Sequence, residues 1–293
     1  FNNESDFDLC YEKKISLIEY SKSKKEIPFT VFKPTCIGKA SIFEKISLNN
    51  KLSENEKESW SKIKKRFHGI CKKAKDNNVK ILIDAEEFFV QKAIDELALE
   101  MMIKYNKKQV IVYNTVQMYR HDRMRYLKKL ILDYPEVLFG FKLVRGAYME
   151  KERSRALKYN YKSPICKDKL TTDKNFDTAI DFVFKNLNQI NFICGSHNEL
   201  STLKILDLMS YYNIDVNDDR VWFGQLFGMS DNISFNLAKS SYNVFKILPF
   251  GPVKNLIPYL IRRAQENSSV KGQSGRELNL IQKEIKRRKL KKL

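Results

Sequence analysis

The sequence predicts an α/β fold, a (βα)8 barrel of the TIM type, because short apolar segments alternate with longer helical segments along 293 residues. A barrel of this kind typically uses about 250 residues. The connections between the apolar segments are long enough for right-handed crossovers between parallel strands. No internal repeat or low-complexity stretch interrupts the alternation, so we expect one barrel.

The elements follow in order from the pattern of apolar residues and helix breakers. A polar segment, 1–28, is expected to be partly helical and ends at the breaker Pro28. A strand at 29–35 comes next, and residues 40–78 form a charged helical excursion. Further strands are expected at 79–84, 109–114, 138–145, 191–196, 220–226 and 243–248. Helices are expected at 88–105, 121–132, 176–188, 199–212, 230–239 and 259–267.

We divide the chain into the N-terminal segment 1–28, a barrel at 29–285 and a basic tail at 286–293. The formal charge of +19 would suit nucleic acid or an anionic membrane. Lysine is spread along the whole chain, however, with many Asn and Ile, as in proteins of AT-rich genomes, so no nucleic-acid partner is expected. Only 283–293 is a basic cluster, and its amphipathic pattern suits either a membrane surface or a solvated terminus.

The cysteines and the hydropathy indicate an intracellular globular protein. Five cysteines are scattered without a C-x-x-C pair, which predicts a reducing compartment with neither a disulfide framework nor a metal site. No signal peptide is recognisable, and no apolar run approaches the ~18 residues of a membrane span. We expect the cytoplasmic face of the inner membrane in a bacterium, or the mitochondrial matrix or inner membrane in a eukaryote.

Polar residues recur at the ends of the expected strands, where a parallel barrel has its mouth. Each has a plain structural interpretation: Asp84 as a helix N-cap, His197 as a hydrogen-bonded loop histidine, Gln117 as a turn residue. Together they predict a polar site at one face. The set is Lys33, Asp84, Gln117, Arg145, His197 and Gln225.

The helix expected at 259–267 places Tyr259, Arg262, Arg263 and Glu266 on one face, because residues three and four apart are helical neighbours. Two adjacent guanidiniums suit a carboxylate or phosphate, and Glu266 can hold one of them in place. The alternative is a solvated basic helix with an i,i+4 salt bridge.

Six ordered motifs resemble those of the proline dehydrogenase family, in its mitochondrial-type branch. The resemblance covers 29–285 and is weakest at 40–78. The motifs are Asp84-Ala-Glu86; Asn114-Thr-Val-Gln117; Lys142-Leu-Val-Arg-Gly-Ala-Tyr148 with Glu150-Lys-Glu-Arg153; Ser196-His-Asn-Glu199; Phe223-Gly-Gln-Leu226 with Gly228-Met; and Tyr259-Leu-Ile-Arg-Arg-Ala-Gln-Glu-Asn267.

The resemblance implies a distorted (βα)8 barrel that holds FAD, oxidises L-proline to 1-pyrroline-5-carboxylate and passes electrons to a membrane quinone. Arg262 and Arg263 would bind the substrate carboxylate, and Asp84, paired with Lys33, would steer the amine. The other substrate contacts would be Tyr148, Leu226, Ile247 and Tyr259. The FAD contacts would be Gln117, Lys142, Val144, Gly146, Ala147, Ser196, His197, Asn198, Gln225 and Glu266.

One position departs from the family pattern: Ile247 stands two residues before Pro249, where the family usually has a tyrosine over the substrate ring. The acceptor of the amine proton stays open. Two other functions compete with proline oxidation. One is a barrel lyase or aldolase with Lys33 as a Schiff-base lysine. The other is a protein that binds polyanions through its basic surface.

Overall fold

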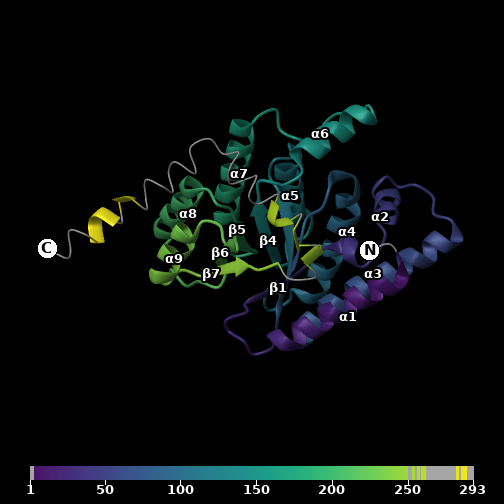
Figure 1. Ribbon diagram of the computed structural model, residues 1–293, viewed down its shortest axis with the longest axis horizontal. Coiled ribbons are helices and arrows are strands. Elements are labelled where there is room, and N and C mark those ends of the chain that lie inside the picture. Colours follow the sequence, from purple (N-terminus) through teal and green to yellow (C-terminus); the bar gives the residue numbers. More distant parts are fainter. Residues whose placement is uncertain are drawn as a thin grey trace. The chain divides into compact units, whose positions relative to one another are not determined.

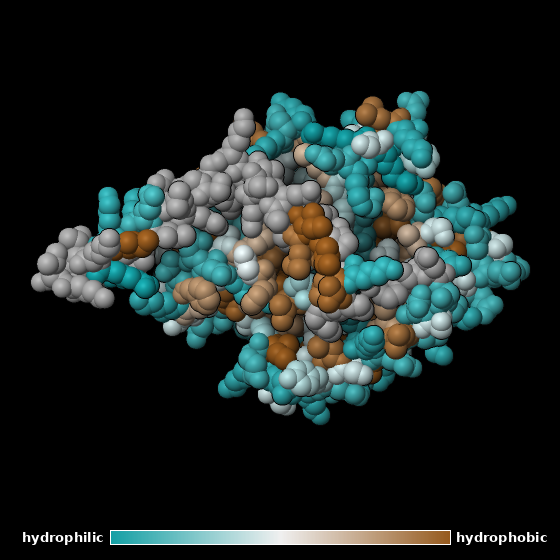
Figure 2. Space-filling model, in the orientation of Figure 1, coloured by the Kyte–Doolittle hydropathy of each residue, from teal (hydrophilic) through white to brown (hydrophobic). Residues whose placement is uncertain are grey.

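The computed structural model describes residues 3–249, 253–254, 256–257, 259–261, 282–283 and 285–288. The chain divides into two compact units, Phe1–Lys246 and Ile247–Leu293. Within the described residues, no helix is both long and apolar enough to cross a bilayer. Hydrophilic residues predominate along the edges of the face seen in Figure 2, and hydrophobic residues gather nearer its middle.

Within the part of the chain that the structure describes, the sheet has seven strands that lie side by side in the order of the sequence (Figure 1). Each neighbouring pair from β1 to β6 is parallel. The strands are β1 Phe29–Phe32, β2 Lys80–Ile83, β3 Val112–Gln117, β4 Phe139–Val144, β5 Ile190–Gly195, β6 Val221–Leu226 and β7 Val244–Ile247. Sequential parallel order is the topology of a βα barrel, as predicted.

Helices connect the strands and cover the sheet. They are α1 Glu4–Ser21, α2 Ala40–Ser47, α3 Glu54–Asp76, α4 Phe88–Tyr105, α5 Arg123–Asp133, α6 Met149–Lys158, α7 Lys169–Phe184, α8 Glu199–Tyr211 and α9 Asp231–Lys239, with a short 3-10 helix at Pro34–Cys36. The excursion at 40–78 contains α2 and α3, and a capping box of Ser53 and Glu56 fixes the start of α3.

Aromatic rings at the amino ends of the strands show that the sheet curls round on itself. The ring of Phe29 in β1 lies 5.4 Å from that of Tyr113 in β3, 5.1 Å from that of Trp222 in β6 and 4.7 Å from that of Phe245 in β7. Contacts between the first strand and the last strands require a barrel-like curvature. The aromatic layer therefore packs across the bottom of the curled sheet, and the predicted distorted barrel fold is confirmed.

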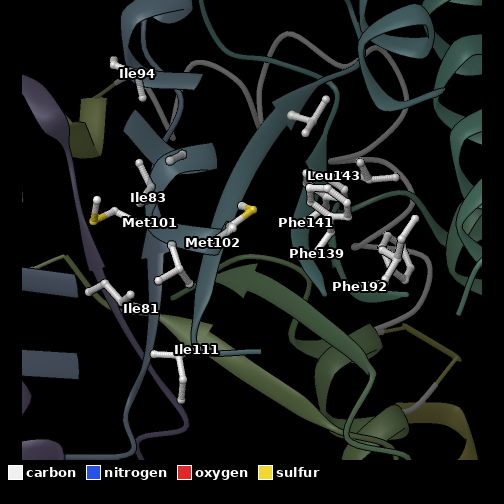
Figure 3. Close-up of a cluster of buried hydrophobic side chains, with 14 of the residues drawn as sticks. Ile81, Ile83, Ile94, Met101, Met102, Ile111, Phe139, Phe141, Leu143 and Phe192 are labelled. Atoms are coloured by element: carbon white, nitrogen blue, oxygen red, sulfur yellow. The ribbon is translucent and has the colours of Figure 1, made fainter. Parts of the chain in front are cut away.

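The alternate residues of the strands form a second apolar layer against the helices (Figure 3). Ile81 and Ile83 of β2 pack here with Met101 and Met102 of α4, and Phe139, Phe141 and Phe192 extend the layer along β4 and β5. Neighbouring residues of a strand point to opposite faces of the sheet. The residues that lie between these positions along each strand therefore point into the barrel interior.

Two differences from the expected elements have physical causes. The third strand begins at Val112 rather than 109, where the carboxamide of Asn106 accepts hydrogen bonds from the N–H groups of Ile111 and Val112 at 3.0 and 2.9 Å. Helix α6 was not predicted, because it buries only Glu152 and Ala156 and so lacks the apolar stripe by which a helix is recognised.

Candidate active site

The period of two along each strand assigns the expected site residues to the barrel interior. Leu82 is fully buried but lies outside the helix-facing layer, and it is paired with Val31 on one side and Tyr113 on the other. Counting onward by two from these residues reaches Lys33, Asp84 and Gln117. The ladder continues past the strand ends, since the Asp84 N–H donates to the Phe32 carbonyl at 3.0 Å. The inward positions at the carboxyl ends are Lys33, Asp84, Gln117, Lys142, Val144 and Leu226.

A buried ion pair joins Lys142 of β4 to Asp84 at the end of β2. The Lys142 Nζ lies 2.5 Å from Asp84 Oδ1, and the two side chains are 5% and 27% exposed. A cation this poorly solvated depends on its counter-charge. The pair carries no net charge, but it fixes the Lys142 ammonium inside the mouth, where the remaining N–H donors of that ammonium could contact an electron-rich bound group.

Lys33 does not pair directly with Asp84, contrary to the expectation. Its Nζ donates to the Tyr148 hydroxyl at 2.9 Å and lies 3.6 Å from Glu86 Oε2, whereas Lys142 reaches across β3 and takes the Asp84 carboxylate. Burial alone would lower the pKa of Lys33, but the negative charge of Glu86 and the interaction with the Tyr148 hydroxyl outweigh it and raise the pKa above its ordinary value. Lys33 is therefore a cation at neutral pH.

Tyr148 is the neutral partner of this cation. Burial raises the pKa of the Tyr148 phenol, and the neighbouring charge of Lys33 offsets only part of that rise. Its hydroxyl accepts the hydrogen bond from Lys33 and keeps its own proton for donation.

Glu86 belongs to the motif Asp84-Ala-Glu86, but the sequence predicted no role for it. Glu86 is buried, with 7% of the residue exposed. Its carboxylate Oε1 accepts hydrogen bonds from the Oγ1 and the N–H of Thr35 at 2.7 and 3.3 Å. Its own N–H donates to Gln91 Oε1 at 2.7 Å. The alternation of side chains along β2 could have identified Glu86 from the sequence. Glu86 follows Asp84 by two residues, so it is expected on the same inward side.

Two inward side chains of β3 have polar atoms without a partner among the described residues. Gln117 is 3% exposed, and its Oε1 makes no hydrogen bond, while its Nε2 lies 3.5 Å from the Tyr119 hydroxyl. The Thr115 Oγ1 is likewise unpartnered. A buried polar atom without a hydrogen bond costs about 1–3 kcal/mol, so these atoms mark where polar groups of a ligand could bind.

The loop after β4 exposes backbone at the mouth. Gly146 and Ala147 are exposed, and Gly146 has φ of +130°. A Cβ at this position would come within 2.6 Å of the Tyr119 ring, so glycine satisfies both the backbone conformation and the close approach.

The segment Ser196–Asn198 forms the amino end of α8 and has the electrostatics of an anion site. The Asn198 side chain caps the helix by accepting from the Ser201 N–H at 3.0 Å. Arg145 donates to Ser196 Oγ and to Ser201 Oγ, both at 3.0 Å. Arg145 is also paired with Asp173 at 2.6 Å, so attraction for a phosphate group here comes mainly from the backbone N–H groups of the helix amino terminus.

Gln225 and His197 contact the neighbouring helix α9. Gln225 is 1% exposed, donates to the Ser196 carbonyl at 3.3 Å and accepts from Ser234 Oγ at 2.9 Å. A ring nitrogen of His197 lies 3.1 Å from Ser230 Oγ. Gln225 therefore holds the Ser196 segment in place, and both ends of its carboxamide are engaged by protein atoms.

The expected residues near the carboxyl end belong to the second unit. Ile247 ends β7 and Tyr259 lies in a helical stretch, and both are in the unit that begins at Ile247. Arg262, Arg263 and Glu266 lie outside the described residues, as does most of the basic tail.

Relatives of known identity cover most of the chain. The chain is 33% identical to the carbapenem antibiotics biosynthesis protein CarD of Pectobacterium carotovorum over 98% of its length and 74% of that protein. It is 40% identical to proline dehydrogenase 1 of Dictyostelium discoideum, covering 82% of this chain and 43% of that one. It is 39% identical to the hydroxyproline dehydrogenase of Xenopus laevis, covering 81% and 52%. The chain thus spans about half the length of these two dehydrogenases.

Among solved structures, proline utilization A from Bdellovibrio bacteriovorus matches with a TM-score of 0.80 at 20% identity, over 91% of this chain and 29% of that protein. This match concerns the fold alone. The profile of the family described as proline dehydrogenase matches residues 2–276. The match over nearly the whole chain, together with the identities above, means that the chain belongs to the proline dehydrogenase family.

Proposed function

We propose that the protein catalyses the FAD-dependent oxidation of L-proline to 1-pyrroline-5-carboxylate and passes the electrons to a quinone. One observation carries the proposal: the buried cation of Lys142 lies on the inner face of β4, next to the strand that holds the unpartnered Gln117 Oε1. An electron-rich heterocycle could donate a hydrogen bond from an N–H group to Gln117 Oε1 and accept one from the Lys142 ammonium at a carbonyl group.

The residues of the mouth fit the two halves of FAD. Gln117 Oε1 can accept from a ring N–H, and Lys142 can stabilise negative charge on the ring. Val144, Gly146 and Ala147 would line the ring through side chain and exposed backbone. Ser196, His197 and Asn198, at the start of α8 beside Arg145, suit the pyrophosphate, and Glu266 is a further contact implied by the resemblance. Gln225 would support that segment rather than contact the cofactor.

Proline would lie between the flavin and the residues at the strand ends. Lys33, Asp84, Tyr148 and Leu226 would shape this pocket, with Ile247 and Tyr259 as further contacts. Arg262 and Arg263 would clamp the carboxylate and so hold the reacting carbon about 3–3.5 Å from its acceptor.

The reaction removes a hydride and a proton from proline. The bound FAD would supply the acceptor for the hydride that leaves C5 of proline, the ring carbon next to nitrogen that does not bear the carboxylate. The nitrogen loses its proton, and its electron pair forms the C=N bond of the product. The Asp84 side chain is 27% exposed, so its carboxylate, shared with Lys142, could attract the cationic amine of arriving proline.

The observations favour this reaction over the alternatives. A Schiff-base lysine needs a lowered pKa to be nucleophilic, whereas Glu86 and Tyr148 raise the pKa of Lys33. A polyanion-binding protein would not require a buried ion pair inside a barrel mouth. Contact with the membrane quinone would be peripheral, and the basic segment 283–293 is the candidate surface.

The test is the anaerobic addition of L-proline to the purified yellow protein. Bleaching of the flavin absorbance is expected, and reoxidation by an added soluble quinone should restore it. A colourless protein that cannot bind FAD, or a flavin spectrum unaffected by proline, would refute the proposal. Parallel addition of hydroxyproline decides between the substrates of the two kinds of relatives.

A further inference from the structure

We propose that Glu86 is a positioning residue of the reaction, which holds the Lys33 ammonium in place at the wall of the substrate pocket. The inference rests on the proposed function and extends it to a residue that the motifs left without a role.

Glu86 is held through one oxygen of its carboxylate and through its backbone N–H. Its Oε1 accepts from Thr35 Oγ1 at 2.7 Å and from the Thr35 N–H at 3.3 Å, which leaves Oε2 toward Lys33 at 3.6 Å. The backbone of Glu86 is tied to the buried carboxamide of Gln91 at 2.7 Å. Because these hydrogen bonds fix the position of the carboxylate, the contact forms only when the Lys33 side chain adopts a rotamer that reaches it.

The same buried network anchors the support of Glu86 to the barrel. Gln91 Nε2 donates to Asp95 Oδ1 at 2.8 Å, and Asp95 Oδ2 accepts from Arg123 at 2.7 Å. Asn114 of β3 also donates to Asp95, at 2.9 Å. Glu86 is thus connected to rigid elements of the fold rather than to a free loop.

Lys33 depends on this support because its side chain is 51% exposed, while that of Glu86 is only 9% exposed. A long side chain at this exposure samples several rotamers unless partners select one. Glu86 and Tyr148 provide two partners on different elements, and together they aim the ammonium at the mouth. Without Glu86, the Tyr148 phenol would be the hydrogen-bond partner left to Lys33 among the described residues.

The experiment is a double-mutant cycle in kcat/KM for L-proline. Glu86→Gln keeps the size and the Thr35 contact but removes the charge, and should lower kcat/KM roughly tenfold, mainly through KM. In a Lys33→Met background the same substitution should have no further effect, because it acts through Lys33. Flavin content should be unchanged in all four proteins.

Glu87→Gln is the matched control. Glu87 lies 3.6 Å from Lys151 of α6, the same separation as Glu86 from Lys33, so the substitution removes the same charge from a similar pair. It should leave kcat/KM within about twofold of the wild type, as expected for a partly exposed pair. Equal losses of kcat/KM in Glu86→Gln and Glu87→Gln would overturn the inference. So would a further loss of kcat/KM when Glu86→Gln is added to Lys33→Met.

Thr35→Val serves as a second variant if Glu86→Gln does not fold. It deletes the hydroxyl that holds Glu86 and should raise the KM for proline without releasing flavin; an unchanged KM would contradict the inference. A wild-type protein that does not oxidise proline would refute the proposed function and this inference together. If the wild type is active and Glu86→Gln leaves kcat/KM unchanged, the inference is refuted but the proposed function is not.

Discussion

The buried pair of Lys142 and Asp84 predicts an asymmetry in stability between two deletions. Asp84→Ala leaves the ammonium of Lys142, whose side chain is 5% exposed, without a counter-charge. Breaking a buried pair in this way costs about 3 kcal/mol, the lower end of the usual range, because the site opens at the mouth. Lys142→Met leaves the Asp84 carboxylate, which is 27% exposed and can be hydrated, at a cost of about 1 kcal/mol.

The assay is thermal unfolding of the FAD-free protein, so that cofactor affinity does not contribute. For a chain of this size about 1 kcal/mol corresponds to roughly 2 °C or more, so the midpoint for Asp84→Ala should lie about 4 °C below that for Lys142→Met. The double variant should be more stable than Asp84→Ala, because no charge is stranded. Equal midpoints, or a lower midpoint for Lys142→Met, would refute this description of the pair.

Four further changes test other parts of the site. Gln117→Leu should weaken FAD retention about tenfold, which titration with FAD would measure, while the stability of the apoprotein is unchanged or rises because an unpartnered buried carbonyl is removed. Burial raises the pKa of Glu152, so the fold should lose stability as pH rises from about 4.5 through the folded pKa, and Glu152→Gln should raise the melting midpoint at pH about 7.5 but not at pH about 4.5. Arg262→Met should raise the Kd for proline with flavin still bound; loss of flavin instead would assign the arginine to the cofactor site. Ile247→Tyr should lower the KM for proline, and an unchanged or higher KM would count against the alignment at this position.

The fold was predictable because strands buried on both faces are recognised as apolar runs, and their order then follows from parallel crossovers. Helix α6 was not, since the side chains that dock it are polar: Glu152 accepts from the Phe88 N–H at 2.6 Å, and Arg155 pairs with Glu44. Amphipathic periodicity cannot detect a helix attached through such contacts.

The inward positions of the site residues were also predictable, because they depend on a period of two. The choice of partner was not. Lys33 and Asp84 end neighbouring strands, yet Asp84 pairs with Lys142 from beyond the intervening β3, and Lys33 turns to Glu86 and Tyr148. The reach of long side chains across a curved sheet depends on curvature that the one-dimensional pattern does not contain.

In the proposed function, the barrel mouth transfers a hydride from proline to bound FAD. The most direct measurement is an anaerobic single turnover with stoichiometric L-proline, in which flavin absorbance and trapped pyrroline product are followed together. We expect one equivalent of 1-pyrroline-5-carboxylate for each FAD reduced, as the proposed hydride transfer requires. Reduction without that product, or no reduction in a protein that holds its FAD, would contradict it.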